Sequence, residues 1–340
     1  MTINELIDIA IEQKSSDLHL ASGEVPFVRI SGQLDRLDLP ILNREDIATI
    51  VEPLLTPELR VRYQAGRVVG RSYLYGDFVI SLIMYRCGDE GLAATFRIIR
   101  KAIPALASIG EGAMPLMEKI VGLTQGLVII TGQMGSGKTT TACSIVDAIN
   151  STRASRIFVV AGRPDYWFES KKSLVTQISV GLDCDSFPAA LEIADNSDPD
   201  VVALTDIPTA DTLRQALVTA AYGHLVIASL HAESVVDAVQ GMLATAGSDE
   251  PALRRALAQN VSVISSQRLI RRSDRPGRVA AYDYVTNTPA VREALLTGNL
   301  SRLAELQSID PECRSLNQAL DDLVASGAID EESASHLRTD

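Results

Sequence analysis

Apolar residues in the first hundred positions repeat with two different periods. At positions 3, 6, 7, 10 and 11 they follow the spacing of one helical face, which predicts a helix over residues 3–13. Short apolar runs between residues 18 and 30 predict strands. Helical patterns follow between 43 and 64, and strand patterns return between 67 and 99. Residues 1–100 therefore predict a small α+β domain.

The middle of the chain alternates between short, fully apolar runs and amphipathic stretches. The apolar runs, which predict buried strands, are 127–130, 156–160, 201–204 and 225–230. Helices are expected between and around them, at 113–122, 140–150, 187–196 and 210–221. Strands of this kind separated by helices are typical of a parallel sheet covered on both faces.

The last ninety residues read as helices, at 252–272, 289–307 and 315–336. Together these patterns predict two domains, which suits a chain of 340 residues with 46% hydrophobic residues. We place a linker at 101–112, an α/β domain at 113–340, and a helical C-terminal portion from about residue 252.

Charge and cysteine content narrow the class of protein. The formal net charge of −12 argues against a general nucleic-acid surface or an anionic membrane surface, so we expect no nucleic-acid partner. Four scattered cysteines, with no C-x-x-C pair, predict reduced thiols. The longest apolar run, 78–85, is too short to span a membrane, and the N-terminus lacks a signal-peptide pattern. A cytoplasmic protein fits these features.

A glycine-rich segment between the first apolar run and its helix carries the clearest chemistry. Its spacing is G-x-x-x-x-G-K-[ST], a loop whose backbone N–H groups cradle phosphates while a lysine supplies positive charge and a hydroxyl binds Mg²⁺. A chance glycine turn would lack the flanking strand and helix. The expected nucleotide-binding residues here are Gly132, Gln133, Met134, Gly135, Ser136, Gly137, Lys138, Thr139 and Thr140.

Hydrolysis of a nucleoside triphosphate also needs a carboxylate near the metal and the attacking water. Asp206 follows the third apolar run and is the candidate, together with Thr139, for holding Mg²⁺. Asp206 also has the position of a cap for a helix beginning near Thr209, and the two roles are compatible. Asp200 precedes the same run and is expected in the turn before the strand.

Two histidines bracket the fourth apolar run. His231 falls at its C-terminal end, where ligands bind in open α/β sheets, and is a candidate for catalysis. His224 precedes the run, and we assign it to nucleotide binding. The spacing equally suits core or capping histidines. His19, alone in an expected strand, is interpreted as structural.

Several motifs, which occur in the family's order along the chain, resemble those of the type IV pilus retraction ATPases (PilT-like) of the secretion-type ATPase superfamily. The likeness covers nearly the whole chain and includes the glycine loop as a Walker A motif. The other matching segments are 16–20, 29–32, 169–172 with Gln177, 198–202, 222–232, 266–270, 278–281 and 288–292. Absence of paired cysteines favours pilus motors over secretion ATPases that carry a zinc element.

The resemblance implies a PAS-like N-terminal domain, a RecA-like P-loop motor domain with C-terminal helices, and ATP with Mg²⁺ as ligands. It also implies a ring, either a homo-hexamer or a mixed ring with a related ATPase. Such a ring works from the cytoplasm, peripheral to the inner membrane, on a pilus platform protein. Arginines of the N-terminal domain are expected to reach the phosphates; Arg86 is a candidate for nucleotide binding and Arg97 for catalysis.

The chain also departs from the family pattern. Adjacent acids of the family's Asp box align with Ala161 and Gly162, and the nearest acid is Asp165. Asp206 stands where the family has a glutamate, one methylene longer. The length of this side chain matters, because displacing a catalytic group by about 1 Å lowers the reaction rate substantially.

Three interpretations follow from these matches and departures. The main one is a retraction motor that hydrolyses ATP. The others are a catalytically weakened accessory or regulatory nucleotide-binding subunit, and a type II/IV secretion ATPase.

Overall fold

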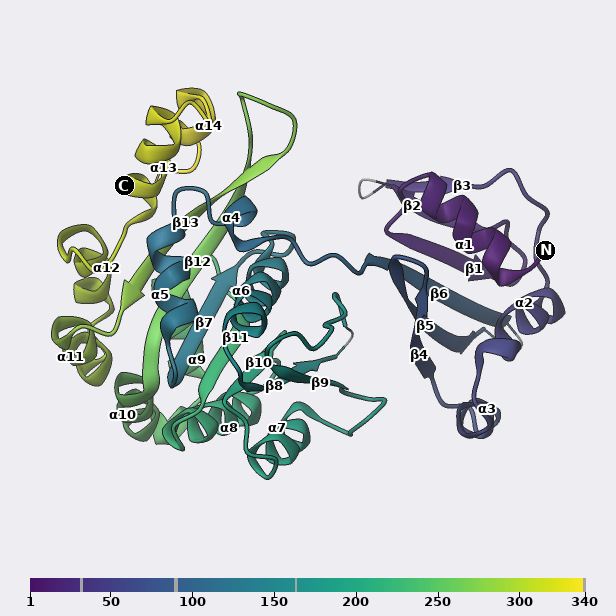
Figure 1. Ribbon diagram of the computed structural model, residues 1–340, viewed down its shortest axis with the longest axis horizontal. Helices are drawn as coiled ribbons and strands as arrows, with labels where there is room; N and C mark the ends of the chain where they lie inside the picture. The colour runs from purple at the N-terminus through teal and green to yellow at the C-terminus, as the bar shows by residue number, and fades with distance from the viewer. Residues whose placement is uncertain (31–32, 89–90, 163, 339–340) are drawn as a thin grey trace. The chain divides into compact units, whose positions relative to one another are not determined.

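The computed structural model describes residues 1–30, 33–88, 91–162 and 164–338 and divides into two compact units (Figure 1). The first unit holds the described residues of Met1–Ala102 and Arg163–Trp167, and the second holds those of Ile103–Gly162 and Phe168–Asp340. Both units combine helices with a single sheet, which confirms the predicted mixed α/β class.

The first unit is built on an antiparallel sheet of strand order β3-β2-β1-β6-β5-β4. Its apolar core joins α1 and α2 to alternate residues of the strands. A capping box formed by Thr2 and Glu5 begins α1. The elements are α1 (Ile3–Glu12), β1 (Asp17–Ala21), β2 (Phe27–Ile30), β3 (Gln33–Arg36), α2 (Arg44–Val51), η1 (Glu52–Leu54), α3 (Pro57–Gln64), β4 (Val69–Tyr75), β5 (Phe78–Cys87) and β6 (Gly91–Arg100).

The second unit contains a sheet of strand order β13-β12-β7-β11-β10-β8-β9, parallel except for β13 (Figure 1). Its strands are β7 (Gly126–Gly132), β8 (Arg156–Ala161), β9 (Leu174–Ser179), β10 (Val201–Leu204), β11 (Leu225–His231), β12 (Val261–Arg271) and β13 (Arg278–Thr286). Its helices are α4 (Leu106–Ile109), α5 (Met114–Gly122), α6 (Lys138–Thr152), α7 (Phe187–Asp195), α8 (Ala210–Ala221), α9 (Val235–Ala244), η2 (Gly247–Asp249), α10 (Glu250–Asn260), α11 (Pro289–Thr297), α12 (Leu300–Ile309), α13 (Leu316–Ala325) and α14 (Glu331–Ser335).

The central strands of this sheet carry continuous runs of buried apolar residues because helices cover both faces. Alternate strand residues such as Leu127 and Val226 face one core with α7, α8, α9 and α10. On the other face α6 contacts β7, β10 and β11, and α5 packs on α6. This burial fixes the register, so the carboxyl ends of β7, β11 and β10 lie at one edge.

The predicted helix over 252–272 is wrong in its second half. The helix α10 ends at Asn260, and the next residues form β12, which pairs in parallel with β7. The β-branched residues Val261, Val263 and Ile264 are buried there, and strand pairing next to β7 outweighs a helical reading of the same apolar run. With β13 also in the sheet, the helical C-terminal portion begins at Pro289 rather than about 252.

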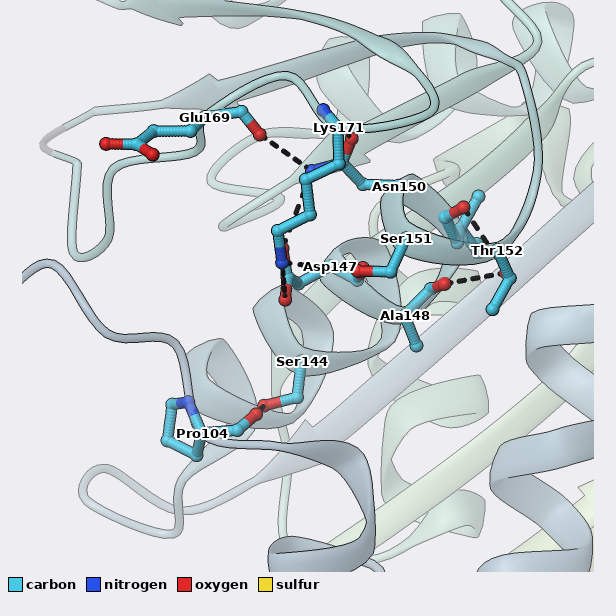
Figure 2. A network of polar contacts seen from close by, with 10 residues as sticks. Pro104, Ser144, Asp147, Ala148, Asn150, Ser151, Thr152, Glu169 and Lys171 are labelled. Atoms are coloured by element: carbon cyan, nitrogen blue, oxygen red, sulfur yellow. Dashed lines mark hydrogen bonds and ion pairs between the residues drawn. The ribbon is translucent and has the colours of Figure 1, made fainter.

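The predicted linker, 101–112, is largely part of the second unit. Chain from Ile103 onward groups with that unit, and it contains the short helix α4. Ser144 of α6 donates a hydrogen bond of 2.7 Å to the Pro104 carbonyl, as Figure 2 shows. A Pro-containing segment reads as a linker from sequence, but this contact holds it against α6.

The far end of α6 is anchored to the segment that precedes β9 (Figure 2). The Lys171 ammonium lies 2.7 Å from both carboxylate oxygens of Asp147. Asn150 donates to the Glu169 carbonyl at 2.9 Å and accepts from the Lys171 backbone N–H at 3.1 Å. These bonds explain the segment at 169–172: it holds the helix that follows the glycine loop.

A buried carboxylate between β12, β13 and α12 makes stability depend on pH. Asp283 is 5% exposed and accepts a 3.1 Å hydrogen bond from Gln307. Burial raises the pKa of Asp283 to about 6, against the opposing hydrogen bonds from Gln307 and Ser266 and the charge of Arg268. Because the folded-state pKa is raised above its unfolded value, the free energy of unfolding falls as pH rises from about 4 to about 6.

We expect Asp283→Asn to abolish this decrease in the free energy of unfolding with rising pH. Asparagine can still accept the Gln307 bond, so the variant should be more stable than the wild type by about 2 kcal/mol at pH 8, with the difference vanishing below pH 4. Urea unfolding of both proteins across this pH range measures it. The exposed variant Asp211→Asn is the matched control. If the difference in unfolding free energy between Asp283→Asn and wild type does not change with pH, the raised pKa of Asp283 is wrong.

Candidate nucleotide-binding site

The loop between β7 and α6 has a backbone that only glycine adopts readily. Gly132, Gly135 and Gly137 have φ angles of +150°, +78° and +90°. A Cβ atom on Gly132 would lie 2.5 Å from the Gln267 carbonyl oxygen, and one on Gly137 would lie 2.8 Å from the Gln267 amide nitrogen. The glycines therefore let the loop curl tightly against β12, as a phosphate cradle requires.

The lysine of the loop is held by neutral groups. Lys138 is 7% exposed, and its Nζ donates to the carbonyls of Gly132 at 2.8 Å and Gln133 at 2.9 Å. Burial lowers the pKa of Lys138, and the charge of Asp206 opposes that shift. A buried ammonium bonded to carbonyls is readily transferred to a stronger partner, and the phosphates of a nucleotide are such a partner.

Gln267 of β12 supports the loop from below. Its Nε2 donates to the Ser136 carbonyl at 2.7 Å, and its Oε1 accepts from Thr141 Oγ1 at 2.8 Å. Tyr282 extends the network: its hydroxyl lies 3.3 Å from Thr141 Oγ1 and donates to the Ile109 carbonyl at 3.1 Å. Sequence reasoning missed Gln267, because its role depends on β12 lying beside β7 and that stretch was expected to be helical.

We expect Gln267→Leu to loosen the phosphate loop. The substitution leaves the buried Ser136 carbonyl and Thr141 hydroxyl without their partner, which should cost about 2–3 kcal/mol of unfolding free energy and weaken nucleotide binding by about tenfold. Urea unfolding and titration with a fluorescent ADP analogue measure the two effects. Gln259→Leu, at an exposed position of α10, is the control. Unchanged affinity in Gln267→Leu would show that the network does not shape the loop.

A cavity of about 290 Å³ opens beside the loop and the first turns of α6. It is bordered by Ser108, Thr140, Thr141, Leu269 and Tyr282, among others. A space lined by hydroxyls and apolar groups next to a phosphate cradle has the chemistry to take the base or the ribose of a nucleotide.

His231 and Asp206 both lie at the edge of the sheet that carries the loop. His231 pairs in register with Gly132, and its Nδ1 lies 3.3 Å from Lys138 Nζ. Asp206 follows β10, and its Oδ1 accepts from the backbone N–H of Ile207 at 2.9 Å. Thr209, not Asp206, caps α8, so the carboxylate is not used as the helix cap. Asp200 lies in the turn before β10, as predicted, and accepts from the Arg156 backbone N–H at 2.7 Å.

His224 lies away from His231 and Asp206 within the second unit. It precedes β11, at the opposite end of the strand from His231, and its carbonyl accepts from the Gly126 N–H at 3.0 Å. One strand length of about 20 Å separates the two ends. The assignment of His224 to nucleotide binding is therefore not supported by its place in the fold, because both histidines bracket one strand and only one can face the loop.

The two arginines assigned to the phosphates belong to the first unit and have partners there. Arg97 NH1 lies 3.2 Å from the Asp165 carboxylate. The Arg86 guanidinium lies over the Tyr63 ring, 5.5 Å from its centroid, and donates to the Gln64 carbonyl at 3.3 Å. Contact of either arginine with a nucleotide stays a prediction.

The remaining predicted residues lie on the loop or at the start of α6. Gln133 and Met134 are exposed at the loop's tip, Met134 to 89%. Thr139 and Thr140 are half-buried in the first turn of α6. The roles of the two threonines at metal and nucleotide stay predictions.

Comparison with known proteins agrees with this architecture. Residues 94–338 match the family described as Type II/IV secretion system protein. The type IV pilus retraction ATPase PilT of Pseudomonas aeruginosa is 29% identical, over 98% of this chain and 97% of that protein. A twitching motility protein of Neisseria gonorrhoeae is 27% identical, over 94% of this chain and 88% of that protein. The crystal structure of the pilus retraction motor PilT with bound ADP superposes with a TM-score of 0.87 at 30% identity, covering 100% and 98% of the two chains.

These matches define the class of protein first: the chain belongs to the Type II/IV secretion system protein family. Within that family it is a PilT-like member, since its likeness to PilT extends over both units. In the described parts of the chain, no helix is both long and apolar enough to cross a bilayer.

Proposed function

We propose that this chain is an ATP-hydrolysing motor of the type IV pilus retraction type. The observation that carries the proposal is the phosphate loop, in which a buried Lys138 is held by two carbonyls next to His231. The likeness to PilT over the whole chain adds the cellular role, which a fold alone would not supply.

The chain's own residues account for phosphate binding. Lys138 would exchange the carbonyls of Gly132 and Gln133 for oxygens of the outer phosphates. Backbone N–H groups of the loop and the N-terminus of α6 add partial positive charge. His231, at the end of β11 beside the lysine, would contact the terminal phosphate and so distinguish ATP from ADP.

Mg²⁺ fits the same edge of the sheet. Thr139 follows the lysine, and Asp206 is close enough to act on the charge of Lys138. Hydroxyl and carboxylate oxygens, together with phosphate oxygens, are the ligands that Mg²⁺ prefers. The ion, when bound, neutralises charge on the phosphates, while Thr139 and Asp206 would hold it in place.

The proposal extends to the assembly. A homo-hexamer, or a mixed ring with a related ATPase, acting at the cytoplasmic face of the inner membrane on a pilus platform protein would convert hydrolysis into movement of the filament. A secretion role also suits the chain, because the matching family is described as Type II/IV secretion system protein.

A second candidate function rests on a specific feature of this chain. Ala161 and Gly162 stand at the end of β8, where the resemblance leads us to expect acids, and Asp206 is shorter than glutamate. Such a chain could bind ATP and enter a ring while turning over slowly, as an accessory or regulatory subunit.

Replacing the chromosomal gene by one encoding Lys138→Ala tests the cellular role. A retraction motor predicts cells that keep surface pili and lose twitching motility. Loss of the pili themselves, or of protein secretion with motility intact, would contradict a retraction role. Unchanged motility and secretion would contradict any requirement for ATP binding by this chain.

A further inference from the structure

The nucleotide-binding site has one candidate carboxylate, Asp206, for two tasks: holding the metal ion and orienting the attacking water. Asp206 Oδ1 already accepts the backbone N–H of Ile207. At the end of the next strand, β8, Ala161 and Gly162 provide no acid.

A carboxylate outside the predicted set lies against the phosphate loop. Glu233 Oε1 accepts a 3.1 Å hydrogen bond from the side chain of Gln133. Gln133 is the first variable residue of the loop, and its carbonyl holds the Lys138 ammonium at 2.9 Å. The Glu233 side chain is exposed, so its carboxylate lies at the open side of the cradle rather than in the core.

The backbone beneath this side chain is fixed by the strands on either side. Thr131 donates to the Ala232 carbonyl at 3.2 Å, and Ala232 bridges to Gly132. Ser266 of β12 donates to the Glu233 carbonyl at 3.2 Å. The segment after β11 therefore crosses the end of β7 in one conformation, while the carboxylate it carries is free to turn.

The two acids act on different parts of the loop. The charge of Asp206, at the end of β10, acts on Lys138, whereas Glu233 accepts a hydrogen bond from the side chain of Gln133. β11 lies between β10 and β7, so the end of β11 is nearer to the loop in strand order. This arrangement separates an acid on the metal side from an acid on the solvent side of the cradle.

We propose that Glu233 orients and deprotonates the water that attacks the terminal phosphate, a step that rests on the ATP hydrolysis proposed above. Water oxygen forms the new bond to phosphorus, and the bond to the bridging oxygen breaks with its electron pair on ADP. The proton that water loses passes to the Glu233 carboxylate and from there to solvent. Gln133, released from Glu233 when phosphate enters, leaves the carboxylate free to receive that water.

The electrostatics of the bound state favour this role. A carboxylate near the charged terminal phosphate binds a proton more tightly than one in water, because protonation relieves the repulsion between like charges. Raised proton affinity is what a general base needs in order to accept a proton near neutral pH.

Two substitutions separate a catalytic role from a structural one. Glu233→Gln keeps an oxygen that can accept the Gln133 bond and removes the charge, whereas Glu233→Ala removes both. If Glu233 only holds Gln133, the Gln variant should behave like wild type and the Ala variant alone should be impaired. If Glu233 is the base, both variants should lower kcat by about 100-fold with KM changed by less than about threefold.

Steady-state turnover and nucleotide binding, both measured on the 340-residue chain, test the role of Glu233. The variants Glu233→Gln and Glu233→Ala are compared with Glu192→Gln, an exposed control on α7. ADP affinity should be unchanged in Glu233→Gln, while affinity for ADP with aluminium fluoride, which mimics the transferring phosphoryl group, should fall by about tenfold. The acid limb of the kcat–pH profile should also disappear.

Binding of ADP–aluminium fluoride shows whether the role of Glu233 fails alone or the proposed ATPase function fails with it. If the wild-type chain binds ADP–aluminium fluoride and Glu233→Gln binds it equally well, the assignment of Glu233 is wrong and the ATPase proposal stands. If the wild-type chain fails to bind ADP–aluminium fluoride while binding ADP, both are wrong. Wild-type turnover in Glu233→Gln overturns the inference directly.

Discussion

Replacing Lys138 by alanine should abolish measurable ATP turnover, a loss of at least about 100-fold in kcat/KM. The reason is the place of its ammonium: it is buried, it touches the two carbonyls that open the loop, and it lies beside His231. Without it, the cradle holds the outer phosphates with backbone N–H groups alone.

The measurement is a paired one, with ATP hydrolysis and the affinity for a fluorescent ATP analogue determined on the same preparation. Lys119→Ala removes a lysine of α5 whose partner, Glu312, is exposed, so this control should retain wild-type turnover. Hydrolysis that survives in Lys138→Ala would mean that another loop binds the nucleotide.

Replacing Asp206 by alanine should lower kcat by about 100-fold and raise the Mg²⁺ concentration needed for half-maximal rate. Asp206→Glu should retain or increase turnover, because the added methylene extends the carboxylate by about 1 Å towards the reacting groups. Both follow from the place of this carboxylate just after β10, where its charge acts on Lys138.

A Mg²⁺ titration of the hydrolysis rate distinguishes these effects, with Asp211→Ala on α8 as the control, since Asp211 is exposed and pairs with Arg214 at the surface. An Asp206→Ala variant with wild-type kcat and wild-type Mg²⁺ dependence would remove Asp206 from the metal site. An inactive Asp206→Glu variant would show that the shorter side chain is required by the space around it.

The parts of the site that lie next to each other along the chain were predictable from sequence. Fixed spacing from Gly132 to Thr139 defines the loop, and the apolar runs around it define β7 and the start of α6. His231 and Asp206 were placed correctly at strand ends, because parallel strands bring their carboxyl ends to one edge.

Parts that depend on which strands are neighbours were not predictable in this way. Gln267 reaches the loop because β12 lies beside β7. Glu233 reaches it because the segment after β11 crosses the end of β7. A run such as 261–271, with apolar residues on both faces, suits a helix and a buried strand about equally by periodicity. His224 precedes the N-terminal end of β11, and its assignment to nucleotide binding did not follow from the rule that ligands bind at the carboxyl ends of parallel strands.

ATP hydrolysis by this chain is tested most directly by phosphate release from Mg-ATP by the purified 340-residue protein, with nucleotide binding measured in the same sample. Steady release that stops when EDTA removes Mg²⁺ is the expected result. ATP bound with no phosphate released above the EDTA background would contradict it, and would identify the chain as an accessory nucleotide-binding subunit.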